Sequence, residues 1–133
     1  MSSSPRYIAP TGFQKLVNRM VGRLGLAYVL AVRGRTSGQW RTTTVFVLEM
    51  DGTRYLVAPR GETQWVRNLR AAGEGELRRR GKLERFRAVE LPEQDKPRLI
   101  EAYIARWRSI VGKEFEAMPD PADHPVFRLE PRQ

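Results

Sequence analysis

The sequence predicts a mainly β domain of the α+β class, in which an antiparallel sheet of about six strands closes on itself and carries three peripheral helices. The first indication is the pair Asp51-Gly52 between two strand-like runs, which is a strong hairpin signal. The second is another pair of strand-like runs on either side of Gly81-Lys82. The third is that helices are too few to alternate with strands, which argues against a parallel sheet.

The chain has the size and composition of one ordinary domain. It contains 133 residues, of which 41% are hydrophobic and 29% charged. These values exclude wholesale disorder and fit a single core. We expect residues 1–11 to form a loose arm and residues 12–133 to form the domain.

The first predicted helix covers Phe13–Leu24, where apolar residues recur at helical spacing between Thr11 as a cap and Gly25 as a stop. Its other face carries three basic residues, Lys15, Arg19 and Arg23. This amphipathic pattern leaves contact with an anionic membrane surface open.

The middle of the chain alternates between strands and one short helix. Leu26–Arg33 is continuously apolar and predicts a buried strand, while Thr42–Glu49 is β-branched and predicts the next. Arg54–Ala58 is the returning strand of the Asp-Gly hairpin. Thr63 is then placed to cap a helix over Gln64–Ala72.

The last third contains a second hairpin and the longest helix. Glu76–Arg80 and Leu83–Leu91 are the hairpin strands. Pro92–Val111 is the helix, because Pro and acidic residues stand in its first turn and apolar residues follow at helical spacing. Val126–Leu129 is expected to be a final strand.

Several classes of site are excluded or disfavoured. The chain has no cysteine, which excludes a disulfide scaffold, a cysteine nucleophile and a Cys-ligated metal. The single histidine, His124, follows Asp123 in a loop, where a loop hydrogen bond is favoured over catalysis. We expect no metal and no side chain in acid–base or nucleophilic catalysis. No run approaches the length of a membrane span, so a cytoplasmic protein is expected.

A formal net charge of +9 predicts an anionic ligand or partner, although a merely solvated basic surface is the alternative. No nucleic-acid-binding motif is present, so nucleic acid is not the expected partner. Instead, the segment between Arg33 and Thr43 combines two glycines, hydroxyl side chains and forked cations, as an anion cradle requires. A plain surface hairpin is the alternative.

A second candidate segment, from Val57 to Arg70, runs from a strand end through Gly61 into a helix. Free backbone donors at a helix start hold anions or polarised carbonyls. Trp65 lies on this helix, where a core position is the alternative to a ligand contact.

These two segments together resemble the flavin/deazaflavin-dependent oxidoreductases, specifically the deazaflavin-dependent nitroreductase branch of actinobacteria. The first motif is Gly-Arg-x-(Ser/Thr)-Gly-x-x-Arg at residues 34–41, and the second is Trp-x-x-Asn-Leu-(Arg/Lys)-Ala at residues 65–71. The closing run His-Pro-Val-Phe-Arg-Leu-Glu-Pro adds to the likeness. The resemblance implies a split β-barrel like that of flavin reductases and coenzyme F420 as cofactor.

The resemblance also implies which residues bind that cofactor. The first turn would hold its phosphate and polyanionic tail through Arg35, Thr36, Ser37, Gly38 and Arg41. The next strand would lie along its ring through Thr43, Thr44 and Phe46. The ring edge would meet Val57, Ala58, Pro59, Arg60, Gln64, Trp65 and Asn68.

The expected activity is transfer of hydride from the reduced deazaflavin to an electron-poor acceptor such as a quinone, a nitroaromatic or an enone. FMN is the alternative cofactor. Thr36 stands where the family usually has a basic residue, and the loop Pro59–Glu62 is short. Both features resemble a sub-branch associated with fatty-acid or lipid ligands, so a lipid-binding member without F420 activity is the other alternative. Related barrels occur as monomers and as homodimers.

Overall fold

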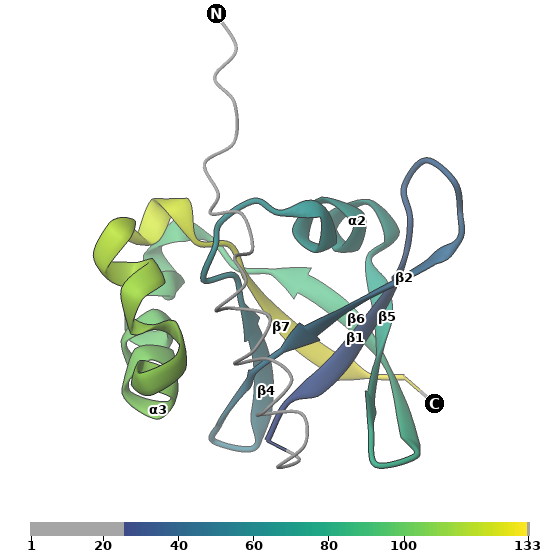
Figure 1. Cartoon of the computed structure of the whole chain (residues 1–133), viewed down its shortest axis with the longest axis horizontal. Coiled ribbons are helices and arrows are strands. Elements are labelled where there is room, and N and C mark those ends of the chain that lie inside the picture. The colour runs from purple at the N-terminus through teal and green to yellow at the C-terminus, as the bar shows by residue number, and fades with distance from the viewer. Residues whose placement is uncertain (1–25, 133) are drawn as a thin grey trace, which may run out of the picture.

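The computed structural model describes residues 26–132, which form a curled antiparallel sheet with two α-helices (Figure 1). The loose arm predicted at residues 1–11 and the helix predicted over Phe13–Leu24 lie outside the described residues. The described residues form seven strands, where about six were predicted. They are β1 (Tyr28–Arg33), β2 (Trp40–Val45), β3 (Val47–Met50), β4 (Thr53–Val57), β5 (Glu74–Arg79), β6 (Lys82–Glu90) and β7 (Val126–Pro131).

All neighbouring strands pair antiparallel, in the order β2-β1-β5-β6-β7-β4-β3. The strands at the two ends of this order follow each other in the chain, separated only by Phe46. The sheet therefore curls until its two edges approach, which gives a half-barrel. The antiparallel curled sheet confirms the prediction from the hairpins, although the predicted sheet closed on itself.

The additional strand arises because the single strand predicted over Thr42–Glu49 is divided at Phe46. Val45 and Phe46 are adjacent and both buried, although successive side chains of a strand point to opposite faces. They enter different parts of the core, Val45 with Leu30 and Phe46 against Trp107, with ring centroids 5.1 Å apart. The chain bends at this point, and β2 ends where β3 begins.

Both predicted hairpins are present. Asp51 and Gly52 have φ values of 55° and 79°, as expected for a tight turn with two left-handed residues. In the second hairpin the turn residues are Arg80 and Gly81, with φ values of 52° and 77°, so the turn lies one residue earlier than Gly81-Lys82.

The helices are α2 (Gln64–Ala72) and α3 (Lys96–Ala117), and 3-10 turns cover Glu93–Asp95 and Pro121–Asp123. α2 matches its predicted range, although the Thr63 side chain makes no cap hydrogen bond. α3 begins later and ends later than the predicted Pro92–Val111. Phe115 extends its buried face past Val111.

The two helices cover different parts of the sheet (Figure 1). α3 packs on the part near β3, with Tyr103, Trp107 and Phe115 in one apolar cluster. α2 packs near β1 and β5, with Val66 and Leu69 in a second cluster. The loop from β4 to α2 lies between these two regions, and it forms one side of the cleft described next.

Candidate functional site

A cleft of about 930 Å³ lies between the β1–β2 turn and the start of α2. Four arginines stand at this cleft, one on the turn, one on β2, one on the β4–α2 loop and one on α2. The lining residues are Val32, Gly34, Arg35, Thr36, Ser37, Arg41, Thr42, Thr43, Arg60, Glu62, Thr63, Gln64, Trp65, Arg67 and Asn68. The two segments singled out in the sequence therefore form opposite walls of one cleft.

The two walls are joined by a hydrogen-bonded contact between Arg35 and Asn68. The Oδ1 atom of Asn68 accepts from the Arg35 backbone N–H at 3.1 Å and from Arg35 Nη1 at 2.8 Å. Asn68 is buried on α2, so the β1–β2 turn is fixed against that helix. This contact therefore fixes the distance between the two walls of the cleft.

The β1–β2 turn is also closed on itself. The Gly34 N–H donates to the Gln39 carbonyl at 2.7 Å, and the Gly38 N–H donates to the Gly34 carbonyl at 2.9 Å. Gly38 has a φ of 73°, a conformation that favours glycine, and it supports the turn without lining the cleft. These two bonds fix the shape of the turn, from which Thr36 and Ser37 face the cleft beside Arg41 of β2.

The opposite wall presents the N-terminus of α2. Thr63 lies at the start of this helix, where the first backbone N–H groups have no partner within the helix. Its hydroxyl oxygen is buried and has no hydrogen-bond partner among the described residues. An unpaired hydroxyl beside free helix donors is a chemically suitable place for an anion or a polar ring edge.

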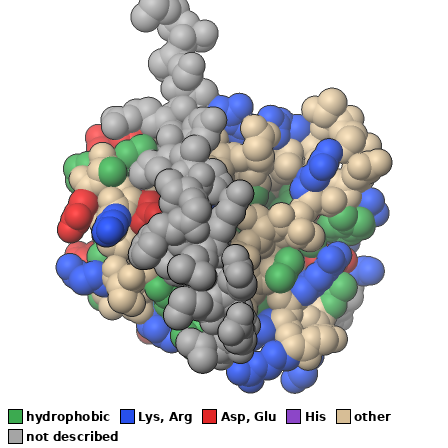
Figure 2. Space-filling view, in the orientation of Figure 1, with side chains coloured by type: hydrophobic (Ala, Val, Ile, Leu, Met, Phe, Trp, Pro, Cys, Tyr) green, Lys and Arg blue, Asp and Glu red, His purple; other side chains and the backbone are tan. Residues whose placement is uncertain are grey.

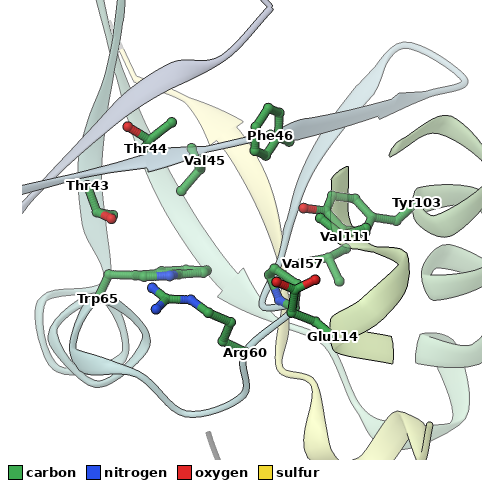
Figure 3. A pocket seen from close by; sticks show the side chains of 11 residues that line it. Thr43, Thr44, Val45, Phe46, Val57, Arg60, Trp65, Tyr103, Val111 and Glu114 are labelled. Atoms are coloured by element: carbon green, nitrogen blue, oxygen red, sulfur yellow. The ribbon is translucent and has the colours of Figure 1, made fainter. Parts of the chain in front are cut away.

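A smaller pocket of about 40 Å³ adjoins the cleft and shares Thr43, Arg60 and Trp65 with it (Figure 3). Its other walls come from β2, the residue at the bend, the β4 end and α3. These residues are Thr44, Val45, Phe46, Val57, Pro59, Tyr103, Val111 and Glu114. Figure 3 shows Arg60 reaching from its loop toward the ring of Trp65, with Glu114 and Tyr103 on the α3 side.

The comparison with known proteins agrees with this geometry. Residues 10–115 match the model of the F420H(2)-dependent quinone reductase family. The chain belongs to this family. It is therefore an oxidoreductase, as the resemblance to deazaflavin-dependent enzymes implied. A search of curated proteins finds no match.

Solved structures support the fold of this family member. One similar structure is an F420-H2 dependent reductase, with a TM-score of 0.62, 18% identity, and coverage of 79% of this chain and 94% of that one. A protein of unknown function from Agrobacterium tumefaciens has a TM-score of 0.63 and 23% identity. That likeness covers 98% of this chain but only 60% of the Agrobacterium protein.

A third similar structure is an FAD-binding protein from Mesorhizobium loti, with a TM-score of 0.52, 19% identity, and coverage of 89% of each chain. At these identities the three structures show a shared fold.

The structure brings the sequence-predicted site residues together with two exceptions. Every one of them lines the cleft or the small pocket except Gly38 and Ala58. Ala58 is buried, and its carbonyl oxygen accepts from the Gly61 N–H at 3.3 Å and faces His124 Nδ1 at 2.8 Å. Trp65 packs on Phe127 at a centroid distance of 6.1 Å and also lines the cleft, so its ring is placed where a ligand could contact it.

Sequence reasoning missed Glu62, Thr63 and Arg67 as cleft residues and Val111 and Glu114 as pocket residues. Glu114 stands three positions after the core residue Val111, on the same face of α3. An acidic residue at an apolar helical position was the available signal for a site.

Burial changes the electrostatics of two pocket residues. Burial, and secondarily the charge of Glu114, raises the pKa of Tyr103, so this hydroxyl keeps its proton. Burial lowers the pKa of Arg60, and Glu114 partly opposes that effect. The pocket thus combines a neutral phenol with one cation and one acidic side chain.

The other polar features of the family member lie outside the cleft. His124 is fully buried between the carbonyls of Ala58 and Met118 and stacks on Phe115, which confirms its expected role in loop hydrogen bonding. Basic side chains are spread over several parts of the visible face and do not form one stripe (Figure 2). Among the described residues, no helix could cross a membrane and no side-chain group could hold a metal ion.

Proposed function

We propose that this chain binds reduced coenzyme F420 in the cleft and reduces an electron-poor acceptor, such as a quinone, a nitroaromatic or an enone. The observation that carries this proposal is the cleft itself, which combines Arg35, Arg41, Arg60 and Arg67 with the unpaired hydroxyl of Thr63. A flat ring with a polyanionic tail suits a cleft that has cations on both walls and an aromatic side chain on one of them.

Different residues of the cleft would contact different parts of the cofactor. The wall formed by the β1–β2 turn and the start of β2, here called the outer wall, would hold the phosphate and tail through Thr36, Ser37 and Arg41. The hydrogen bonds to Asn68 keep Arg35 beside these residues. Thr43 and Trp65 would flank the ring, because they line both the cleft and the small pocket. Val57, Pro59 and Gln64 would meet its edge.

The chain's own contribution to the reaction is binding, orientation and exclusion of water. The reduced deazaflavin supplies the hydride when bound. Phe46, Val57 and Val111 give the small pocket apolar walls beside its polar side chains, and a bound ring over them would displace water from the reacting groups. The neutral hydroxyl of Tyr103 is available to donate a hydrogen bond to an acceptor oxygen.

Charge removal at the outer wall tests this proposal. We expect the double variant Arg35→Ala, Arg41→Ala to weaken F420 binding by about tenfold or more, because each exposed cation on a polyanion contributes roughly 1 kcal/mol. Arg98→Ala is the matched control, since Arg98 is exposed on α3 and lines neither the cleft nor the pocket. Unchanged affinity in the double variant would contradict the proposal.

A fatty acid or another amphiphile is the second candidate ligand. Trp40 is 40% exposed, and the guanidiniums of Arg33 and Arg78 lie 4.2 Å and 5.7 Å from its ring. The exposed ring suits contact with an apolar acyl chain, and the guanidinium of Arg33 beside it suits the carboxylate of that chain. Mass spectrometry of ligands that co-purify with the protein separates the candidates, because it identifies either acyl chains or a deazaflavin.

A further inference from the structure

We propose that the small pocket beside the cleft is a subsite for a neutral hydrogen-bond donor, a hydroxyl or an N–H group, carried by the hydride acceptor. Glu114 is the residue that accepts this hydrogen bond. The inference rests on the proposed function, because it adds a preference among acceptors to the reaction assigned above.

The unpaired oxygen of Glu114 is the first observation. Its Oε2 atom is buried and has no hydrogen-bond partner in the described part of the chain. A buried carboxylate oxygen without a donor costs free energy, and nearly all such atoms in folded proteins have a partner. The atom belongs to a residue that lines the small pocket, so a donor placed there can reach it.

The surroundings of Glu114 define the chemistry of that donor. Tyr103 and Arg60 line the same pocket, and Glu114 influences the pKa of both. Figure 3 shows the Glu114 carboxylate on the α3 side of the pocket, with the Tyr103 side chain on the same side. Phe46, Val57 and Val111 make apolar parts of the remaining walls, while Thr43 and Thr44 add hydroxyl side chains on the β2 side.

Size and charge narrow the ligand group further. A cavity needs a volume of about 10–15 Å³ to hold one water molecule. The small pocket has a volume of about 40 Å³, which is enough for a hydroxymethyl-sized group but not for an aromatic ring. An alkyl group, or an anionic group without an N–H or O–H, would leave the Oε2 atom unpaired. The acceptor ring would therefore remain in the cleft while a neutral donor substituent enters the pocket.

Two acceptors of nearly equal shape test the inference. One is a naphthoquinone with a single hydroxymethyl substituent, and the other is the same naphthoquinone with an ethyl substituent. We expect the wild type to prefer the hydroxymethyl compound by about tenfold or more, because a buried hydrogen-bonding site discriminates strongly against a ligand that leaves it unpaired. The preference is measured as kcat/KM with reduced F420 and, without cofactor, as the Kd from quenching of tryptophan fluorescence.

Three variants assign the preference to Glu114. Glu114→Leu should remove or reverse it, and Glu114→Gln, which keeps one acceptor oxygen, should retain part of it. Glu116→Leu is the matched control, since Glu116 is exposed on the same helix and should keep the wild-type preference. Circular dichroism of each variant confirms that it is folded.

Equal kcat/KM and Kd values for the two compounds in the wild type would overturn the subsite, while the proposed function would stand if both quinones are reduced. The same preference in the wild type and in Glu114→Leu would also overturn it. Failure to bind F420 or to reduce either quinone would contradict the proposed function, and the cofactor-free Kd values would then decide the subsite separately.

Discussion

A single side-chain oxygen of Asn68, Oδ1, accepts hydrogen bonds from both the backbone N–H and the guanidinium of Arg35, at 3.1 Å and 2.8 Å. The two residues are 33 positions apart, one in the β1–β2 turn and the other on α2. This contact joins the two sequence segments on which the resemblance to deazaflavin-dependent oxidoreductases was based.

Asn68→Ala tests this joint. We expect it to lower the free energy of unfolding by about 1–3 kcal/mol, because the backbone N–H of Arg35 loses its acceptor in a partly buried place. Asn68→Asp should remain close to the wild type, since a carboxylate oxygen accepts both bonds. Urea denaturation measures both, with the exposed Gln64→Ala as control. An Asn68→Ala variant as stable as the control would contradict the role assigned to the contact.

Gly75 is a position where β5 admits no side chain. A Cβ atom there would lie 2.9 Å from the Ala31 carbonyl oxygen and 3.0 Å from Phe86 Cζ. We expect Gly75→Ala to destabilise the protein by about 1–3 kcal/mol, since backbone of β1 blocks the space. The midpoint of thermal unfolding reports this change.

Gly112→Ala is the matched control for Gly75→Ala. On α3 the added Cβ would meet only Arg108 Cγ, at 3.6 Å. Alanine is the better helix former, so this variant should be as stable as the wild type or more stable by up to about 1 kcal/mol. Equal losses in the two variants would show that the contact with β1 is not the cause.

The burial of the Tyr103 hydroxyl makes the free energy of unfolding depend on pH in the alkaline range. Its pKa is raised above the ordinary 10.0, so above that pH the unfolded chain loses this proton while the folded chain keeps it. The associated stability is fully present below about pH 10 and falls as pH rises toward the folded pKa, by at most about 1.4 kcal/mol per pH unit.

Tyr103→Phe removes this titration while keeping the ring in the core. Urea denaturation at a series of pH values from about 8 to about 11 should give a shallower decline for this variant than for the wild type. Parallel declines would mean that the burial of the hydroxyl does not contribute to the alkaline instability.

The parts of the fold that were predictable are those set by local chemistry. The Asp51-Gly52 turn and the Gly73 stop after α2 depend on the conformations of their own residues, and both are present. The division at Phe46 was not predictable from a β-branched run, because it depends on which core regions receive Val45 and Phe46. The end of α3 likewise depends on tertiary packing, because Phe115 is buried in the same apolar cluster as Tyr103.

The candidate site also combines residues that were predictable from sequence with residues that depend on packing. The cleft residues follow motifs that are contiguous in sequence, so their resemblance to a family was enough to single them out. Glu114 comes from α3, and only the packing of that helix near the bend at Phe46 brings it to the pocket. The Thr63 hydroxyl was expected to cap α2, and its unpaired state is a property of the folded chain alone.

The cofactor is the centre of this account, and a binding titration of the purified full-length chain against coenzyme F420 tests it most directly. FMN is titrated in parallel, and cofactor fluorescence reports both. We predict micromolar or tighter binding of F420 and weaker or no binding of FMN. Binding of FMN alone would keep a redox function with another cofactor, and binding of neither would contradict the proposed function.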